Sequence, residues 1–321
     1  MSDRTPRGTR RRLGFAALAL VLLFVSGFGV VQANVLGIGD RLDRLVGRIE
    51  TFVDPPPQRS TLPTVVVTPE PSVAVPTTPP TPEPSASPTP SPTPLVRTPV
   101  DVALVGDHET VFASQLTDKD CAVAATQMVL AILGLGNTSE AFQQEIKDRI
   151  GEWEAFDDSQ NGGWGPAAVG LALETYGATD YEVRAYETYA DALRDSAIAI
   201  TEFDKPVVMF PWWGAHSWVM TGYRADADPT LFDDAAISGA YILDPWYPRN
   251  SSIWGQSDEP GNFEDLAELE RNWPAFQGPP GYETIGPGWS RPEGAYPDRD
   301  GRFVVLVPTT PRAPSAGGSA P

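Results

Sequence analysis

Cysteine and histidine are scarce in this sequence. Its 321 residues include one cysteine, Cys121, and two histidines, His108 and His216. A single cysteine excludes a disulfide within the chain, and three such ligands are too few for a four-ligand zinc site. We therefore expect no cofactor and no bound metal ion.

Basic residues are scarce beyond residue 100. The chain has 23 basic and 42 acidic residues. Residues 1–100 hold 10 of the basic and 7 of the acidic ones, so residues 101–321 hold 13 basic and 35 acidic residues. This acidic part repels phosphate backbones and offers no basic stripe, so we expect no nucleic acid partner. The same charge would attract a cationic substrate, but it equally fits a generally soluble acidic surface.

The N-terminus has the pattern of a membrane-targeting segment. Residues 1–12, a predicted cytoplasmic basic tail, hold five arginines and one acidic residue, and residues 13–33 form an uncharged apolar run of 21 residues. About 20 apolar residues span a bilayer as a helix, so we expect a transmembrane anchor with the rest of the chain outside the cytoplasm. The first alternative is a signal peptide cleaved after Ala33. The second is a twin-arginine signal, which the pair Arg11-Arg12 would supply.

Proline is concentrated before residue 100. Residues 34–53 are predicted to be a juxtamembrane segment, and residues 54–100 alternate proline with serine, threonine and valine. Such a composition cannot bury a core, so we predict a disordered, semi-rigid stalk that holds the next domain away from the membrane. A second low-complexity segment, residues 309–321, is predicted to be a disordered tail.

Residues 101–308 have the pattern of one globular domain. Their apolar periodicity predicts helices early in this range and antiparallel strands late in it, an order that indicates an α+β domain. The predicted helices are 121–133, 139–150, 166–176 and 189–203, and the predicted strands are 181–185, 207–211, 217–223, 240–244 and 303–307.

Cys121 stands at the start of the first predicted helix, with Asp118 or Asp120 as the candidate cap. A helix start beside an imidazolium stabilises the thiolate, which is the nucleophilic form of cysteine. An unprotected thiol outside the cytoplasm favours a chemical role. A small buried structural residue has the same local pattern, however, so the position alone leaves both interpretations open.

His216 and Asp244 are the candidate partners of this thiol. His216 opens a predicted strand, and Asp244 ends the next strand signal. A histidine takes the proton of a nucleophile, and a carboxylate fixes the tautomer and orientation of the imidazole. His108 lies in a loop outside any clear element and is the alternative base.

The order of these motifs resembles a known family. The matching features are Gln115, Asp120-Cys121, the run Lys205–Val208, the strand from His216 to Gly222-Tyr223, and Asp244-Pro245. In this order they resemble the papain-like bacteriocin-leader peptidases, family 39 of the cysteine peptidases, and their secreted relatives. The resemblance covers roughly residues 101–308. It implies a papain-like cysteine peptidase fold, with N-terminal helices packed on a C-terminal antiparallel sheet.

The resemblance also implies a set of catalytic residues. Cys121 would be the nucleophile, His216 its base and Asp244 the group that orients the base, while Gln115 and the Cys121 N–H would hold the oxyanion. The leader peptidases are usually fused to a transporter with an ATP-binding cassette, and no glycine-rich phosphate loop follows here. Specificity for double-glycine leaders is therefore in doubt for this chain.

The expected function is that of an exported, membrane-anchored cysteine peptidase with a peptide or protein substrate. The same triad would also serve a cell-wall amidase or transpeptidase, and a non-catalytic peptide- or glycan-binding module is the alternative from another class. Four tryptophans near the proposed site would either line a cleft or pack in the core. They are Trp212, Trp213, Trp218 and Trp246. The sequence does not indicate the oligomeric state.

Overall fold

The computed structural model describes residues 62–68, 95–153, 164–277 and 298–312. The predicted cytoplasmic tail, the apolar run 13–33 and the predicted juxtamembrane segment lie outside the described residues. Within the described ranges, no helix has both the length and the apolar character that crossing a membrane requires.

Helices fill the first half of the described domain, as the sequence predicts. The first helix ends where Gly134 takes a left-handed φ of +73°, a conformation that glycine adopts without strain. The second begins at Ser139, whose hydroxyl accepts a hydrogen bond from Phe142 N–H at 3.2 Å. These helices are α3 (Cys121–Leu133), α4 (Glu140–Asp148), α5 (Ile150–Trp153) and α6 (Pro166–Thr175).

The strands form one large sheet and one small hairpin. The sheet contains β1 (Thr64–Val67), β2 (Val100–Ala103), β3 (Tyr181–Tyr186), β4 (Val207–Met209), β5 (Trp218–Ala225), β6 (Ile237–Leu243), β9 (Asn262–Asp265) and β10 (Phe303–Pro308). Their order is β1-β3-β10-β4-β5-β6-β9, with β2 also paired to β5. All pairs are antiparallel except β1 with β3. The hairpin consists of β7 (Asn250–Ser251) and β8 (Gly255–Gln256).

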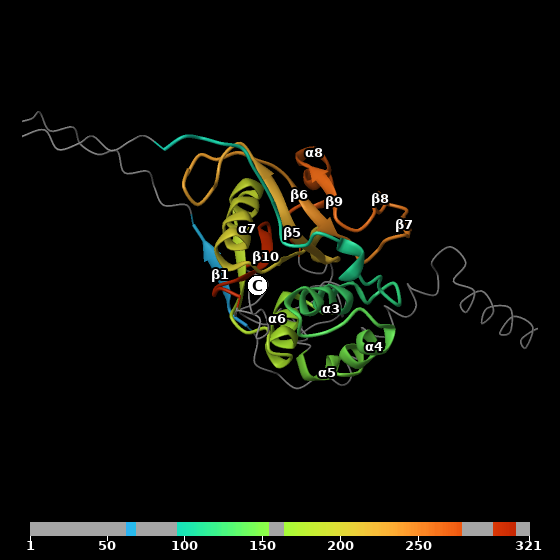
Figure 1. Ribbon diagram of the computed structural model, residues 1–321. Coiled ribbons are helices and arrows are strands. Elements are labelled where there is room, and N and C mark those ends of the chain that lie inside the picture. Colours follow the sequence, from blue (N-terminus) through green and yellow to red (C-terminus); the bar gives the residue numbers. More distant parts are fainter. Residues whose placement is uncertain (1–61, 69–94, 154–163, 278–297, 313–321) are drawn as a thin grey trace, which may run out of the picture. The chain divides into compact units, whose positions relative to one another are not determined.

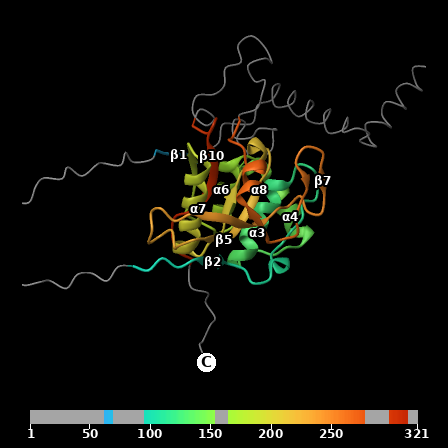
Figure 2. The ribbon, with the colours of Figure 1, turned by 90° about the horizontal axis from the view of Figure 1, so that it is seen from above.

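Helices cover both faces of the large sheet. Alternate side chains of a strand point to opposite faces, so Val304 and Leu306 of β10 pack in the buried cluster that includes α3 and α6. Val305 and Val307 pack in a second cluster with α7 (Tyr189–Phe203) and α8 (Leu266–Asn272). The two helix layers lie on opposite sides of the strands in Figure 1, and Figure 2 gives the view from above. The predicted α+β class is confirmed.

The folded domain begins earlier than predicted. Thr64–Val67, within the predicted stalk, form β1 at one edge of the sheet. Arg97 pairs with Asp226 and Asp234 at 2.9 and 2.6 Å. A run of threonine and valine has high strand propensity, and here it outweighs the surrounding prolines. The prediction of one unbroken disordered stalk over 54–100 is therefore wrong at β1, and residues 69–94 lie outside the described residues.

The domain also extends slightly past its predicted end. Thr309 N–H donates to Asp180 O at 2.8 Å, and Arg312 Nη2 donates to Ile132 O at 2.7 Å. The first four residues of the predicted tail 309–321 thus lie on the domain, and the others are outside the described residues.

Candidate active site

Cys121 is the first residue of α3, as predicted. The helix residues that follow it are almost all buried in the core, whereas Cys121 itself is partly exposed. Its Sγ lies 3.9 Å from the carbonyl oxygen of Ala215, the residue before His216. The burial of α3 therefore fixes the thiol at the surface end of the helix, next to the start of β5.

His216 is held by Asp244. His216 Nε2 lies 2.6 Å from Asp244 Oδ1, and the two side chains are 2% and 10% exposed. The same Oδ1 accepts a hydrogen bond from Trp246 N–H at 2.8 Å, which fixes the carboxylate at the end of β6. The structure thus brings together two residues that are 28 positions apart in the sequence.

The pKa of His216 reflects both Asp244 and the neighbouring Cys121. Burial by itself would lower the pKa of His216, but the Asp244 carboxylate and the adjacent Cys121 outweigh it and raise the pKa to about 9. Because Nε2 is engaged with Asp244, Nδ1 is the ring nitrogen left for the sulfur. The raised pKa favours the imidazolium form of His216.

The turn before His216 has an unusual backbone. Trp212, Trp213 and Gly214, which form the short helix η3, have φ values of +56°, +59° and +84°. Positive φ is strained for residues other than glycine and persists only where the surroundings enforce it. At Gly214 an added Cβ would lie 2.2 Å from the ring of Phe276, so the position accepts only glycine. This turn sets the direction in which β5 starts and hence the place of His216.

The predicted cap of α3 is not made by an aspartate side chain. Asp120 occupies the N-cap position, but its carboxylate accepts hydrogen bonds from Thr117 N–H at 3.0 Å and Lys147 Nζ at 2.8 Å. Asp118 pairs with Arg249 at 2.6 Å. Since the first N–H groups of a helix have no acceptor inside it, the α3 N-terminus beside Cys121 stays without a side-chain cap.

Gln115 lies in the segment before α3 and is 2% exposed. Its backbone N–H donates to Pro245 O at 2.9 Å, which ties it to the residue after Asp244. Its Nε2 donates to Thr117 O at 2.6 Å, and its Oε1 has no hydrogen-bond partner among the described residues. An amide nitrogen carries two N–H groups, so one remains for the predicted oxyanion role.

Arg249 is a residue that sequence reasoning missed. Its Nη2 donates to Gln115 O at 2.8 Å, while its Nη1 pairs with Asp118. It therefore fixes the segment before α3 to the loop after Asp244. No local pattern marks this arginine, because its partners are more than 130 positions away in the sequence.

His108 lies in a different environment. It belongs to the short helix η2 (His108–Thr110), its Nε2 lies 3.2 Å from Thr221 Oγ1, and its ring stacks on Tyr241. Burial lowers the pKa of His108. Among the described residues, its side chain makes no hydrogen bond to Cys121 or Asp244, so the geometry favours His216 as the base.

A group of tryptophans adjoins the His216 ring. Trp212 stacks on His216 with ring centroids 4.0 Å apart, and Trp254 stacks on Trp212 at 5.8 Å. Trp254 lies in the turn between β7 and β8 and was not singled out from the sequence. Trp218, by contrast, is 4% exposed and packs in the core cluster with α7. The half-buried members of the group, hereafter the tryptophan wall, are Trp212, Trp213, Trp246 and Trp254.

Comparisons with known proteins identify the family of this chain. The family model described as the Peptidase_C39 like family matches residues 109–279. A solved structure, "Crystal structure of a double glycine motif protease from AMS/PCAT transporter in complex with the leader peptide", is similar with 16% identity and a TM-score of 0.32, covering 65% of this chain and 99% of that one. No curated protein matches the sequence. The family match includes Gln115, Cys121, His216 and Asp244.

Proposed function

The chain belongs to the Peptidase_C39 like family and is a cysteine peptidase, and on this premise we propose that Cys121, His216 and Asp244 are its catalytic triad. The observation that carries this proposal is the position of His216, whose ring contacts Asp244 at 2.6 Å and whose neighbour Ala215 has its carbonyl oxygen 3.9 Å from Cys121 Sγ. A nucleophile, a base and a group that orients the base are the three parts that such chemistry requires.

In the proposed mechanism His216 carries a proton twice in each cycle, first from the thiol to the leaving amine and then from water back to the sulfur. The imidazole takes the thiol proton, and the thiolate of Cys121 attacks the carbonyl carbon of the scissile peptide bond, which becomes tetrahedral. The C–N bond then breaks, and His216 gives its proton to the leaving amine, which leaves a thioester on Cys121. His216 next takes a proton from water, the hydroxide adds to the thioester carbon, the C–S bond breaks, and the proton returns to sulfur.

The oxyanion of each tetrahedral intermediate needs donors fixed in advance. We assign this role to the N–H of Cys121, at the uncapped start of α3, and to the free N–H of Gln115. Losing one such donor typically lowers kcat by about 10²–10³-fold. Asp244 holds the imidazole in one tautomer in this scheme.

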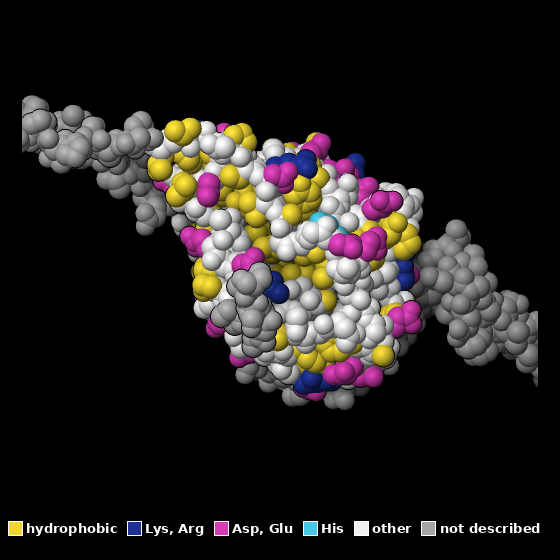
Figure 3. All heavy atoms as spheres, in the orientation of Figure 1, with side chains coloured by type: hydrophobic (Ala, Val, Ile, Leu, Met, Phe, Trp, Pro, Cys, Tyr) yellow, Lys and Arg dark blue, Asp and Glu magenta, His cyan; other side chains and the backbone are white. Residues whose placement is uncertain are grey.

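A peptide or protein is the proposed substrate. The family is one of peptidases, and the half-buried tryptophan wall beside His216 offers apolar surface for the side chains of an extended peptide. Acidic side chains form many separate groups on the face shown in Figure 3, and basic ones form few. This charge favours the approach of substrates with basic residues.

We also propose that the peptidase domain lies outside the cytoplasm, held to a membrane by residues 13–33. The support is the sequence pattern of five arginines followed by 21 uncharged residues. Cleavage after Ala33 would instead release the domain. Either form exposes the triad to substrates outside the cell.

The proposed triad is tested by cleavage of a peptide mixture, with products identified by mass spectrometry. Cys121→Ala should abolish cleavage, and His216→Ala should nearly match it because the two residues act as one unit. Gln115→Ala should lower kcat by about 10²–10³-fold and leave the thiol reactive. His108→Ala is the matched control and should keep the parent rate.

Different outcomes would redirect the proposal. Full activity of His216→Ala together with an inactive His108→Ala would assign the base to the other histidine. Parent-like activity of Cys121→Ala would remove the covalent mechanism altogether. Hydrolysis of amide bonds in cell-wall fragments, with no cleavage of ordinary peptides, would keep the triad but assign it to a cell-wall amidase.

A further inference from the structure

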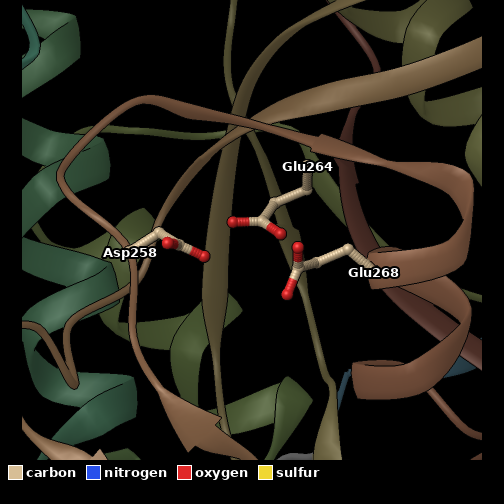
Figure 4. A group of neighbouring side chains, drawn as sticks. All are labelled: Asp258, Glu264 and Glu268. Atoms are coloured by element: carbon tan, nitrogen blue, oxygen red, sulfur yellow. The ribbon is translucent and has the colours of Figure 1, made fainter.

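Three carboxylates from separate elements meet close to the proposed triad. Asp258 follows β8, Glu264 belongs to β9, and Glu268 lies in the first turn of α8. One oxygen of each lies within 4.8 Å of the others. Figure 4 shows the three side chains pointing toward one another. We call these residues the carboxylate cluster.

Glu264 distinguishes this cluster from an ordinary acidic surface. The residue is 6% exposed, and its Oε2 is fully buried with no hydrogen-bond partner among the described residues. Its Oε1 has only the amide of Asn262, at 3.5 Å. A buried carboxylate without a compensating charge is costly. The buried Oε2 of Glu264 therefore requires a positively charged partner, and the described residues do not provide one.

Positive charge near the cluster is limited. Arg271 pairs with Glu268 through one carboxylate oxygen, and no basic side chain among the described residues pairs with Asp258 or Glu264. The segment 257–272 contains six acidic residues and one basic residue. The cluster therefore keeps an excess of negative charge around the buried Oε2 of Glu264.

We propose that the carboxylate cluster binds one Ca²⁺ ion. Ca²⁺ takes six to eight oxygen ligands at about 2.3–2.6 Å, so ligands on its opposite sides are about 4.6–5.2 Å apart. The three carboxylate oxygens lie within 4.8 Å of one another, so one ion of this size can contact all three after small side-chain adjustments. The flexible coordination of Ca²⁺ suits ligands from a loop, a strand and a helix better than the near-ideal octahedral geometry at about 2.0–2.1 Å that Mg²⁺ demands.

The surrounding cavity supplies room and further ligands. It has an empty volume of about 390 Å³, is open to solvent, and is lined by all three carboxylates together with Gln256, Ser257 and Asn272. Side-chain oxygens of these polar residues, and water, would complete a coordination shell.

The same cavity reaches the proposed active site. Asp244 and Trp212 form part of its lining, and Trp254 forms another part. Asp258 follows the β7–β8 hairpin that carries Trp254, so an ion held by Asp258 would fix this hairpin and the Trp254–Trp212 stack beside His216. The ion would thus order the tryptophan wall without taking part in the chemistry.

Terbium luminescence tests this site independently of peptidase activity. Tb³⁺ is an oxygen-seeking substitute for Ca²⁺, and tryptophans in the cavity lining would sensitise its emission. The full-length protein, freed of metal with a chelator, should bind Tb³⁺ at one site from which Ca²⁺ displaces it and Mg²⁺ displaces it poorly. Glu264→Gln should weaken Ca²⁺ binding by at least about 10–100-fold, the loss that even partners of metal ligands cause. Glu270→Gln, on the exposed side of α8, is the matched control and should bind as the parent does.

Thermal unfolding separates loss of the site from loss of the fold. Without Ca²⁺, Glu264→Gln should be at least as stable as the parent, because a neutral amide avoids the cost of burying a carboxyl group that has no charged partner. Added Ca²⁺ should raise the Tm of the parent and of Glu270→Gln but not that of Glu264→Gln. Absence of Ca²⁺ binding by the parent, or equal binding by parent and Glu264→Gln, would overturn the proposal and leave Glu264 as a carboxylate neutralised by a proton only.

Discussion

The protonation state of His216 controls the proposed chemistry. The raised pKa of about 9 means that the imidazolium persists well above the usual titration range of histidine, near 6.5. The charged form pairs with the thiolate, and it is lost as the pH rises through this pKa. Activity should therefore have a basic limb near pH 9.

The variant Asp244→Asn tests whether this carboxylate raises the pKa of His216. Asn keeps the size of the side chain but removes the charge that raises the pKa of His216, so the basic limb of kcat/KM should move to lower pH, with a lower maximum. Asp233→Asn, at a fully exposed carboxylate outside the site, is the control and should leave the limb in place. A limb that stays near pH 9 in Asp244→Asn would show that this carboxylate does not hold the proposed base.

At the scale of single residues, the sequence predicts the place of some site residues well and that of others not at all. Cys121, His216 and Asp244 occur at helix and strand ends, which local periodicity identifies. Arg249 and Trp254 contact the site from the loop and hairpin after β6, and such contacts depend on loop paths that no local pattern determines. The side chain of Asp120, a predicted cap, instead pairs with Lys147 across 27 positions.

At the scale of elements, the turn η3 is the part that places the base. Its three residues have positive φ, and Gly214 also packs against Phe276 with no space for a Cβ. This turn was not predicted, because two consecutive tryptophans with positive φ contradict the usual preferences of turns and are enforced by tertiary packing.

Gly214→Ala should therefore reduce both stability and activity. Backbone strain at a positive φ costs about 1–3 kcal/mol, and the new methyl group would displace Phe276 or the turn. We expect a lower midpoint in urea unfolding and a loss of cleavage that exceeds the loss of folded protein, because His216 follows two residues later. Gly106→Ala is the control, since an added Cβ there meets nothing within 4 Å. Equal stability of the two variants would contradict the proposed role of the turn.

Most helices and strands of the domain were predictable, but the edge strand β1 was not. α3 and α7 have the predicted bounds, because long apolar periodicity determines buried helices. β1 was missed although its threonine and valine run is typical of a strand, because the prolines on both sides favoured a stalk. Its pairing with β3, over 110 positions away, is a tertiary contact that the composition of the segment does not reveal.

At the scale of the whole molecule, the proposal of an anchored domain makes a topological prediction. If residues 13–33 anchor the chain with the domain outside, protease added to intact cells should release a soluble fragment that begins within the predicted stalk, 54–100. The N-terminus of the mature protein, read by mass spectrometry, distinguishes the anchor from a cleaved signal, which would leave Asn34 first. Recovery of the domain in the cytosol, protected from protease, would contradict the proposed location.

The most direct test of the central claim is the rate of alkylation of Cys121 by iodoacetamide as a function of pH. A thiolate paired with the His216 imidazolium should react rapidly already at about pH 6–7, and His216→Ala should lose this fast reaction although its thiol is equally exposed. Because Cys121 is the only cysteine, the reaction reports on one site. A rate that rises only above about pH 8, as for an ordinary thiol, and that is the same in the parent and in His216→Ala would show that the two residues do not form a nucleophile and its base.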